Sequence, residues 1–446
     1  MLSAKMPSAV RCVPMLLVLL AIAAFVATPA GAQTITRIAD INPGTAGAGV
    51  SYVTEYAGAL YFRANDLPHG ADTELWKFDG AAASRVADLY AGPTGSNPSD
   101  LVVFDNKLYF CASATTGGNR LYYHDAATGQ TVLAPGSSSQ ASLPQEMTVY
   151  NGAMYFRASR FGAPSNIGIE LWKYDGVNQT PFDVYDGTGS SYPQHFIEYG
   201  GLLYFNACGT PGQGGELWRT NGTAVAEAAR IYPNNGSSPE NFVIYNDTLY
   251  FSAYDGVHGR ELWSYIGATA TLAADIVPGG QYSSSNPNNM AVYRDDLFFC
   301  ATDEVHGYEL WKFDGTAASM VVEINPTPDP LNGDTFLMDS SPAGLVVYND
   351  VLYFTADDGV NGRELWSYDG VEARMVADIY VGPYGSDIQE LRVWGDSLYF
   401  VANDGQTGSE LTVLGPAVYR FYTPEPATLA LLAFGAAGLV LRRKSR

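Results

Sequence analysis

The sequence is poor in basic residues and in cysteine. Its 446 residues include 24 lysines and arginines against 46 aspartates and glutamates, and only four cysteines. A net charge of −22 repels phosphate groups, which excludes the electrostatic attraction that nucleic-acid and anionic-lipid binding require. We therefore expect no nucleic-acid partner. The acidic surface is compatible with divalent cations, with cationic partners or simply with solubility.

The few cysteines show no spacing typical of disulfide bonds or of a metal site. Cys12 belongs to a segment that we expect to be removed, so Cys111, Cys208 and Cys300 remain, an odd number for an exported protein. Cys111 and Cys300 each follow a phenylalanine at the same position of two sequence repeats, which we expect to lie too far apart to bridge. Neither a CxxC motif nor a zinc-type spacing occurs. We interpret all three as small buried residues.

Catalytic signatures and helix signals are also missing. There is no GxSxG elbow, no HExxH, no P-loop, no GxGxxG before a helix and no sialidase-type aspartate box. Residues 33–422 carry no helical periodicity. The sequence therefore indicates no catalytic residue, which favours a protein that is not an enzyme but leaves an enzyme open.

Both ends of the chain are typical of targeting segments. Lys5 and Arg11 precede the apolar run of residues 15–27, and Ala30-Gly31-Ala32 has the small-x-small pattern of a cleavage site. This arrangement predicts a secretory signal peptide over residues 1–32, with a retained membrane anchor as the alternative. Without its basic ends, the exported part carries 46 acidic against 18 basic residues.

The last 24 residues read TPEPATLALLAFGAAGLVLRRKSR. Pro424-Glu425-Pro426 precedes an apolar run, and a basic end that includes Arg442 and Arg443 follows, as on the cytoplasmic side of a membrane helix. This tail, residues 423–446, resembles the PEP-CTERM sorting signal of Gram-negative bacteria. The resemblance implies export, transient anchoring by a transmembrane helix, and cutting near Pro-Glu-Pro by an exosortase partner. A plain C-terminal membrane anchor is the alternative.

The exported part consists of repeats. An aromatic-Phe pattern recurs eight times, 46 to 55 residues apart, with the phenylalanines at 62, 110, 156, 205, 251, 299, 354 and 400. One copy shows four aromatic or β-branched runs, at 344–348, 351–356, 364–368 and 374–380, bounded by Asn-Asp, Gly-rich and Asp-Gly turns. Such runs are typical of antiparallel strands. Repeats of four strands predict an all-β, eight-bladed β-propeller over residues 33–422, with an open stack of meanders as the alternative.

Two segments are candidates for the outermost strand of the last blade. TRIADI at 36–41 precedes the first complete copy, and AVYRF at 417–421 follows the last third strand. The first segment closes the ring or extends an edge, and the sequence does not decide which.

The third strand of most copies carries Glu-Leu-Trp. The repeats resemble the bacterial ELWxxDGT family over residues 36–415, although most copies lack the final Thr, copy two reads Arg120-Leu121-Tyr122, and copy eight has Thr412 for Trp. The resemblance implies a structural repeat without an agreed chemistry. We interpret the tryptophans as packing between blades and the glutamate as accepting N–H groups of the DGxxG loop. The repeat tryptophans are Trp76, Trp172, Trp218, Trp263, Trp311 and Trp366.

The longer loops, which connect the second strand to the third and one repeat to the next, are predicted on one face. Loops on a rigid scaffold are where binding residues concentrate. One acidic position recurs there, as Asp255, Asp303, Asp358 and Asp404. These carboxylates are our candidate binding residues, and they either offer oxygen ligands to Ca²⁺ or shape their loops as Asx turns. His69, His258 and His306 recur beside them, as turn residues or, alternatively, metal ligands.

Together these patterns predict an exported propeller at the cell surface or in an extracellular matrix. Because proteins with this kind of tail accompany exopolysaccharide, we expect a binding or structural role with a polysaccharide or another surface protein. A polysaccharide-active hydrolase or lyase in the propeller channel is the alternative. It would require carboxylates or histidines at non-equivalent positions around the channel.

Overall fold

A computed structural model of the chain describes residues 35–414, apart from gaps at 40, 43–46, 67–71, 115–117, 138–141, 161–166, 211, 329–337 and 407. The predicted signal peptide and C-terminal tail lie outside these residues. The described part is all-β and contains 32 strands in eight four-stranded sheets. No helix in the described part is long and apolar enough to span a membrane.

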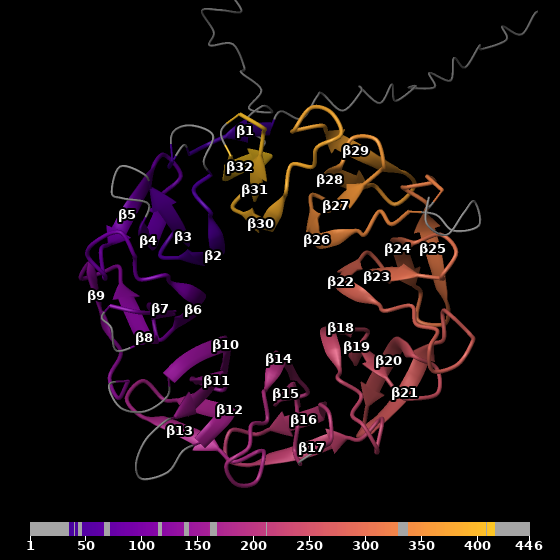
Figure 1. Ribbon diagram of the computed structural model, residues 1–446, viewed down its shortest axis with the longest axis horizontal. Coiled ribbons are helices and arrows are strands. Elements are labelled where there is room, and N and C mark those ends of the chain that lie inside the picture. Colours follow the sequence, from indigo (N-terminus) through magenta and orange to yellow (C-terminus); the bar gives the residue numbers. More distant parts are fainter. Residues whose placement is uncertain are drawn as a thin grey trace, which may run out of the picture.

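The eight sheets are the blades of a closed ring, as the repeat spacing predicted (Figure 1). Blades 1 to 4 run in chain order from the innermost to the outermost strand. Blade 1 contains β2 (Ser51–Tyr56), β3 (Ala59–Asp66), β4 (Asp72–Phe78) and β5 (Ala83–Ala87). Blade 2 contains β6 (Ser99–Phe104), β7 (Lys107–Ala112), β8 (Arg120–Asp125) and β9 (Gln130–Leu133). Blade 3 contains β10 (Ser142–Tyr150), β11 (Ala153–Arg160), β12 (Ile167–Tyr174) and β13 (Gln179–Phe182). Blade 4 contains β14 (Gln194–Tyr199), β15 (Leu202–Ala207), β16 (Glu216–Thr220) and β17 (Val225–Ala229).

Blades 5 to 7 repeat this order, and blade 8 departs from it. Blade 5 contains β18 (Glu240–Tyr245), β19 (Thr248–Tyr254), β20 (Arg260–Ile266) and β21 (Thr269–Ala274). Blade 6 contains β22 (Asn288–Tyr293), β23 (Asp296–Thr302), β24 (Tyr308–Phe313) and β25 (Ala318–Val322). Blade 7 contains β26 (Ala343–Tyr348), β27 (Val351–Asp357), β28 (Arg363–Tyr368) and β29 (Ala373–Ala377). Blade 8 contains β30 (Gln389–Trp394), β31 (Ser397–Asn403), β32 (Ser409–Leu414) and, from the other end of the chain, β1 (Ile35–Arg37).

The ring is closed by the first strand of the chain. β1 pairs antiparallel with β32, so that Ile35 lies opposite Leu414 and Arg37 opposite Thr412. This pairing resolves the two alternatives left by the sequence, because it gives blade 8 four strands without the segment 417–421. That segment lies outside the described residues.

The second strand of each blade forms the core. Both faces of a blade contact a neighbouring blade, so residues on both sides of this strand are apolar and buried. In β27, for example, the five residues from Leu352 to Ala356 are all buried. The repeat phenylalanine lies at the centre, and each of the eight is fully buried. The aromatic-Phe signal in the sequence is therefore a packing signal.

Tyrosine hydroxyls join most neighbouring blades. The last residue of the inner strand is a tyrosine in six blades, and its hydroxyl donates to a carbonyl in the first turn of the next blade. The six pairs are Tyr56 with Asn106, Tyr150 with Gly201, Tyr199 with Asp247, Tyr245 with Asp295, Tyr293 with Asp350 and Tyr348 with Asp396, at 2.6 to 3.0 Å. Phe104 and Trp394 hold this position in blades 2 and 8.

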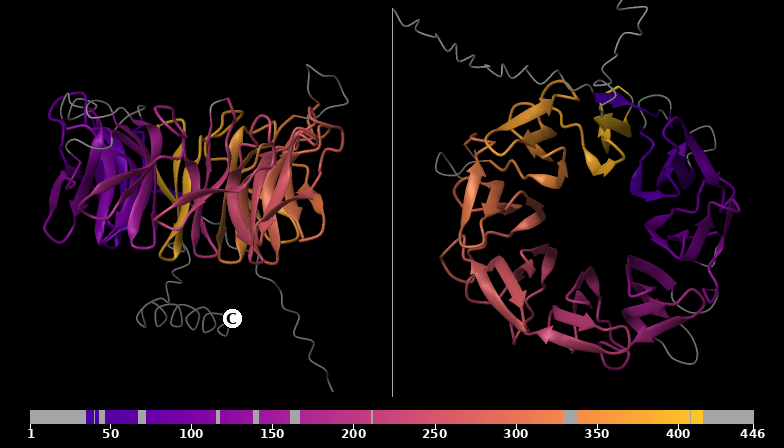
Figure 2. Two further views of the ribbon diagram at one scale, coloured as in Figure 1. Left: turned by 90° about the horizontal axis from the view of Figure 1, so that it is seen from below. Right: turned by 180° about the vertical axis from the view of Figure 1, so that it is seen from behind.

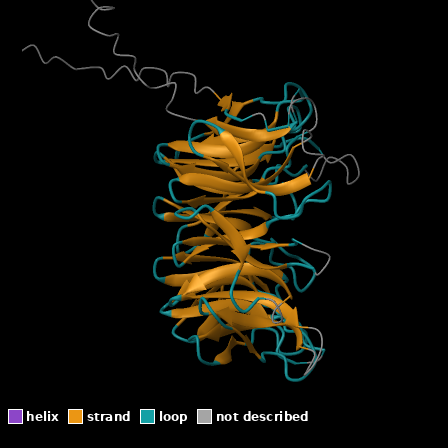
Figure 3. Ribbon diagram, turned by 90° about the vertical axis from the view of Figure 1, so that its left-hand side faces the viewer, coloured by secondary structure: helices purple, strands orange, loops and turns teal. Residues whose placement is uncertain are grey.

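The disc has two unlike faces. The strands cross its thickness (Figure 2), and the turns within the first and last strand pairs of each blade lie on one face, which we call the turn face. The longer connections, between the second and third strands and between blades, lie on the opposite loop face (Figure 3). The predicted binding aspartates belong to the loop face.

Candidate binding face and channel rim

The loop-face aspartates form Asx turns. Asp255 Oδ1 accepts the N–H groups of Val257 and His258 at 2.8 and 2.7 Å, and its Oδ2 lies 2.7 Å from His258 Nδ1. Asp303 makes the same contacts with Val305 and His306. Burial raises the pKa of the Asp255 carboxyl, but the His258 and Val257 hydrogen bonds together lower it below its ordinary value. This carboxylate is thus ionised and shapes its own loop.

The same turn recurs in the two following blades. Asp358 accepts the N–H groups of Val360 and Asn361 and the side-chain amide of Asn361, at 2.7 to 2.9 Å. Asp404 accepts the N–H of Gln406 at 2.9 Å. The histidine position therefore acts as a second donor to the aspartate, a task that asparagine performs equally well. His69 lies outside the described residues.

The glutamate of Glu-Leu-Trp is buried in every blade that has it. Glu364 accepts the N–H groups of Ile379 and Tyr380 at 3.0 and 3.3 Å and the Ser386 hydroxyl at 2.7 Å. Equivalent bonds surround Glu74, Glu170, Glu216, Glu261 and Glu309. The donors come from the connection to the next blade, so our expectation that the DGxxG loop supplies them is wrong.

Burial and hydrogen bonding act against each other on these glutamates. Burial raises the pKa of the Glu364 carboxyl above its ordinary value, and the bonds from Ser386, Ile379 and Tyr380 offset only part of that rise. For Glu309 the pKa reaches about 7. The carboxylate of Glu364 is enclosed by backbone N–H groups and a serine hydroxyl of its own loop, so its role is to fix the loop.

The repeat tryptophans lie at the junctions between blades. Trp172 is fully buried, packs against Phe104 and Tyr109 of blade 2, and donates its indole N–H to the Ala158 carbonyl at 2.9 Å. Trp311 packs in the same way against Tyr245 of blade 5. Trp76 is also buried, whereas Trp218, Trp263 and Trp366 are half-buried. Each contributes apolar surface to the core rather than to either open face.

The innermost strands carry a feature that the sequence reasoning missed. Every one of them has a β-bulge near its start, and the residue in the bulge adopts a left-handed φ between 52° and 63°. These eight residues, which we call the channel rim, are Tyr52, Asp100, Glu146, His195, Asn241, Asn289, Gly344 and Glu390. Left-handed φ strains residues other than glycine and is concentrated where function or packing fixes it. Because the residue types vary, no repeated motif marks the rim.

Side chains of the rim hold neighbouring blades together. Asp100 accepts the N–H of Glu146 at 2.8 Å, and Glu390 accepts the N–H of Tyr52 at 2.8 Å. A pocket of about 410 Å³ lies along this part of the rim, and its lining includes Asp100, Glu146, Glu390 and Arg392. Its acidic groups occupy equivalent positions in their blades, and two of them are bound to backbone N–H groups.

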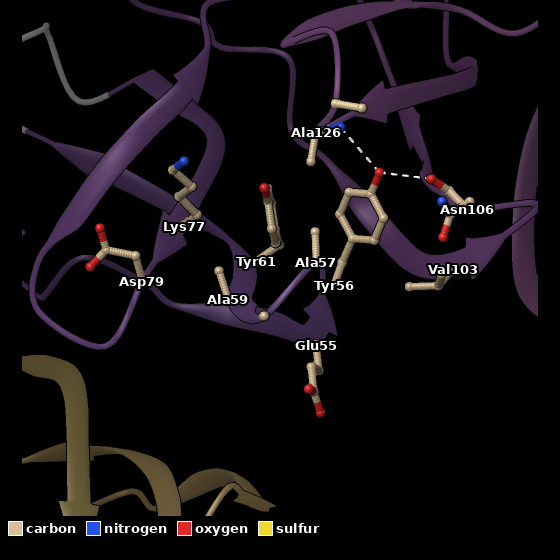
Figure 4. A pocket seen from close by; sticks show the side chains of 12 residues that line it. Glu55, Tyr56, Ala57, Ala59, Tyr61, Lys77, Asp79, Val103, Asn106 and Ala126 are labelled. Atoms are coloured by element: carbon tan, nitrogen blue, oxygen red, sulfur yellow. Dashed lines mark hydrogen bonds between the residues drawn. The ribbon is translucent and has the colours of Figure 1, made fainter.

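A second pocket, of about 730 Å³, opens on the turn face between blades 1 and 2 (Figure 4). The Tyr56 hydroxyl crosses one side of it, donating to the Asn106 carbonyl at 2.9 Å and accepting the Ala126 N–H at 3.1 Å. Lys77 and Asp79 lie on its other side. This pocket offers isolated charges of both signs, and it lies opposite the predicted binding face.

The described residues also include one cluster of possible metal ligands and three thiols, and none of these is a predicted binding residue. Among the described residues, Asp72, Glu74 and Asp88 form the group whose ligand oxygens lie within 4.8 Å of one another, and none of the four loop-face aspartates belongs to it. Arg85 pairs with Asp72 at 2.6 Å and with Asp88 at 3.1 Å, so this group is an ion-pair cluster. Cys111, Cys208 and Cys300 are all free. Burial raises the pKa of Cys111 and Cys300 to about 12, which leaves both thiols protonated.

The fold and the tail define a class, an exported β-propeller with a C-terminal sorting segment. Residues 423–444 match the family described as the PEP-CTERM protein-sorting motif, and this match includes Pro424, Glu425, Pro426, Arg442 and Arg443. Residues 207–414 match a family described as the outer membrane protein assembly factor BamB. Each match covers less than half of the chain. A comparison with curated proteins gave no significant match.

Solved structures match this chain at low sequence identity. A prolyl endopeptidase structure is 11% identical and covers 81% of this chain and 54% of its own, with a TM-score of 0.49. A puromycin-hydrolysing peptidase of Mycobacterium tuberculosis is 11% identical over 83% of this chain and 60% of its own, with a TM-score of 0.46. The β-propeller domain of a protease from Pyrococcus furiosus is 10% identical over 63% of this chain and 85% of its own, with a TM-score of 0.41. The chain thus spans little more than half of the two peptidases.

Proposed function

We propose that the protein is a binding or structural component of the bacterial cell surface or extracellular matrix, associated with exopolysaccharide. The sorting motif assigns it to the exported, envelope-associated proteins. We further propose that its repeats belong to the ELWxxDGT type, that residues 1–32 are removed as a signal peptide, and that an exosortase cuts the tail after transient membrane anchoring.

One observation favours binding or architecture over catalysis. The acidic rim residues Asp100, Glu146 and Glu390 hold the same position in their blades, and Asp100 and Glu390 accept backbone N–H groups of the next blade. A catalytic pair of carboxyl groups requires two unlike environments, so that one is protonated while the other is ionised. Equivalent carboxylates that hold the ring together do not supply such a pair, so a hydrolase or lyase in the channel is the less supported alternative.

The loop face offers a surface for polymer contacts. Its Asx turns present ordered backbone and polar side chains on a rigid ring, which is how loop-based binding sites are built. Asp255, Asp303, Asp358 and Asp404 already accept N–H groups, so we propose that they order this surface and that binding needs no cofactor. Ca²⁺ bound at these aspartates is the alternative, and a calcium titration would test it.

Glycan-array binding and degradation assays on the same polymers would test the proposal. We expect binding to a surface polysaccharide without release of reducing or unsaturated ends. Cleavage of a bound polymer would support the hydrolase or lyase instead. If no polymer binds and crosslinking on cells recovers a protein, the polysaccharide part of the proposal is wrong.

A further inference from the structure

Both ends of the described chain lie on the turn face of blade 8. Ile35, where β1 begins, pairs with Leu414, where β32 ends. Leu414 also pairs with Leu398 of β31, close to the first turn of the blade, where Trp394 pairs with Ser397. In the other blades the last turn starts at the position of Leu414. In blade 8 the described chain ends there, and β1 occupies the position of the fourth strand.

The sorting segment begins a short distance along the chain from Leu414. The matched motif starts at residue 423, and Pro424 is ten residues beyond Leu414. Because an extended chain spans at most about 3.6 Å per residue, at most about 36 Å of chain separates Pro424 from Leu414. The apolar run of the tail follows it directly.

From this geometry we infer that the propeller is displayed with its turn face toward the membrane and its loop face outward. The inference rests on the proposed function, in which the tail anchors the exported chain. While the tail anchors the chain, loop-face residues such as Asp255 and Asp358 then point away from the membrane, where a polymer or a partner approaches. The sorting enzyme, in contrast, meets the chain beneath blade 8.

Charge on the turn face keeps it from adsorbing on anionic lipid. The last turns of five blades begin with an aspartate that caps the turn, and these residues are Asp79, Asp125, Asp175, Asp314 and Asp369. Five first turns add Asp105, Asp247, Asp295, Asp350 and Asp396, and Arg294 of blade 6 pairs with Asp350 at 3.0 Å. A surface of this sign is repelled by anionic headgroups. The propeller is thus held near the membrane by its tail and not by its surface.

Two valines of blade 7 form a matched pair for a test of this orientation. Val360 and Val371 flank opposite ends of β28 and are 67% and 88% exposed. Both donate their N–H to an aspartate two residues earlier, Val360 to Asp358 at 2.9 Å and Val371 to Asp369 at 2.8 Å. A strand of six residues separates the two positions by about 20 Å.

In the experiment, V360C and V371C would be made in the full chain with Cys12→Ser and Cys208→Ser and labelled with one donor fluorophore. The chains would be reconstituted in neutral vesicles that carry acceptor lipids. We expect higher energy transfer from V371C than from V360C, and equal donor emission from both in detergent. Equal transfer, or higher transfer from V360C, would overturn the orientation.

A third chain, without residues 424–446, separates this inference from the proposal on which it rests. We expect it to stay free of the vesicles and to show no transfer. If the full chain also stays free, anchoring by the tail is wrong, and the orientation is overturned with it. If the full chain binds and shows the reverse order of transfer, anchoring holds and only the orientation is wrong.

Discussion

Blades 6 and 8 each enclose a buried glutamate in a loop of backbone N–H groups, although the chain connects the strands of the two blades differently. In blade 6, Glu309 accepts the N–H groups of Ile324 and Asn325 at 2.9 and 3.2 Å, and both donors follow it by about one strand and a turn. In blade 8, Glu410 accepts the N–H groups of Ile41, Asn42 and Ala48 at 3.2 to 3.4 Å, although these residues precede it by more than 360 positions. The hydrogen bonds therefore depend on position in the ring and not on order along the chain.

This comparison shows where the chain can be interrupted. The buried glutamate and its loop form a closed unit in both blades, and only the covalent link between the third and fourth strands differs. Blade 8 thus joins the first described residues to the last ones. We therefore expect the stability of the ring to depend strongly on β1, although this strand has only three residues.

Among the changes proposed in this section, removal of residues 33–41 should lower the free energy of unfolding most. The deletion takes away β1 and the Ile41 donor, and it leaves the buried Glu410 without part of its hydrogen bonding. Because a buried acceptor that loses its donor costs about 1–3 kcal/mol, and the pairing of β1 with β32 is lost as well, we expect the free energy of unfolding to fall by at least that amount. Urea unfolding of the exported chain would measure it. Deletion of residues 415–446 is the control, and an equal loss in both variants would contradict closure by β1.

Much of this architecture could be predicted from the sequence. Predicted strands at 344–348, 351–356 and 364–368 lie within one residue of β26, β27 and β28, because turn residues bound each run. The fourth was predicted at 374–380, but β29 ends at Ala377. Ile379 and Tyr380 leave the strand to donate to Glu364, a contact between residues 15 and 16 positions apart that strand propensity does not report.

The candidate site was less predictable than the fold. The channel rim depends on a register shift between two strands, and residues as different as Tyr52, Asp100 and Gly344 occupy its bulges. The tyrosine hydroxyl bonds between blades did leave a signal, an aromatic residue before every first turn, but the carbonyl that accepts each bond lies one whole repeat further on. Contacts of this kind arise only when the ring brings the blades together.

Replacement of Glu309 by glutamine should change how stability depends on pH. The folded pKa of Glu309 is raised from 4.5 to about 7, so the folded state binds a proton that the unfolded chain has lost. This contribution to stability is fully present below about pH 4.5 and is lost as the pH rises through about 7. We expect wild-type stability to fall over this window by up to about 1.4 kcal/mol per pH unit relative to Glu309→Gln.

Urea unfolding at a series of pH values across this window would measure the difference. Glu304→Gln is the control, because Glu304 is an exposed residue of the same blade. If Glu304→Gln changed the pH profile as much as Glu309→Gln, the titration would not belong to the buried carboxyl. An equivalent profile for Glu410→Gln would show that the split blade 8 encloses its glutamate as tightly as blade 6 does.

The smallest loss of stability is expected for a change at Tyr293, whose hydroxyl links blade 6 to blade 7. Tyr293→Phe removes the hydroxyl that donates to the Asp350 carbonyl at 2.8 Å and keeps the buried ring, which lies 5.5 Å from Phe298. Loss of one such bond lowers the free energy of unfolding by about 0.5–1.5 kcal/mol. Blade 2 offers the reverse change, because Phe104 holds the same position beside a pocket of about 470 Å³ that Gly152 also lines.

Phe104→Tyr should therefore raise stability by a similar or smaller amount, since its new hydroxyl can donate to the first turn of blade 3. Blade 8 has the other exception to tyrosine at the end of the inner strand. There Trp394 has no hydroxyl, and Glu390 instead binds the next blade through the N–H of Tyr52. Thermal unfolding of both single variants would test the account. If Tyr293→Phe left the stability unchanged, the hydroxyl would not stabilise the junction between the blades, and the position would serve packing alone.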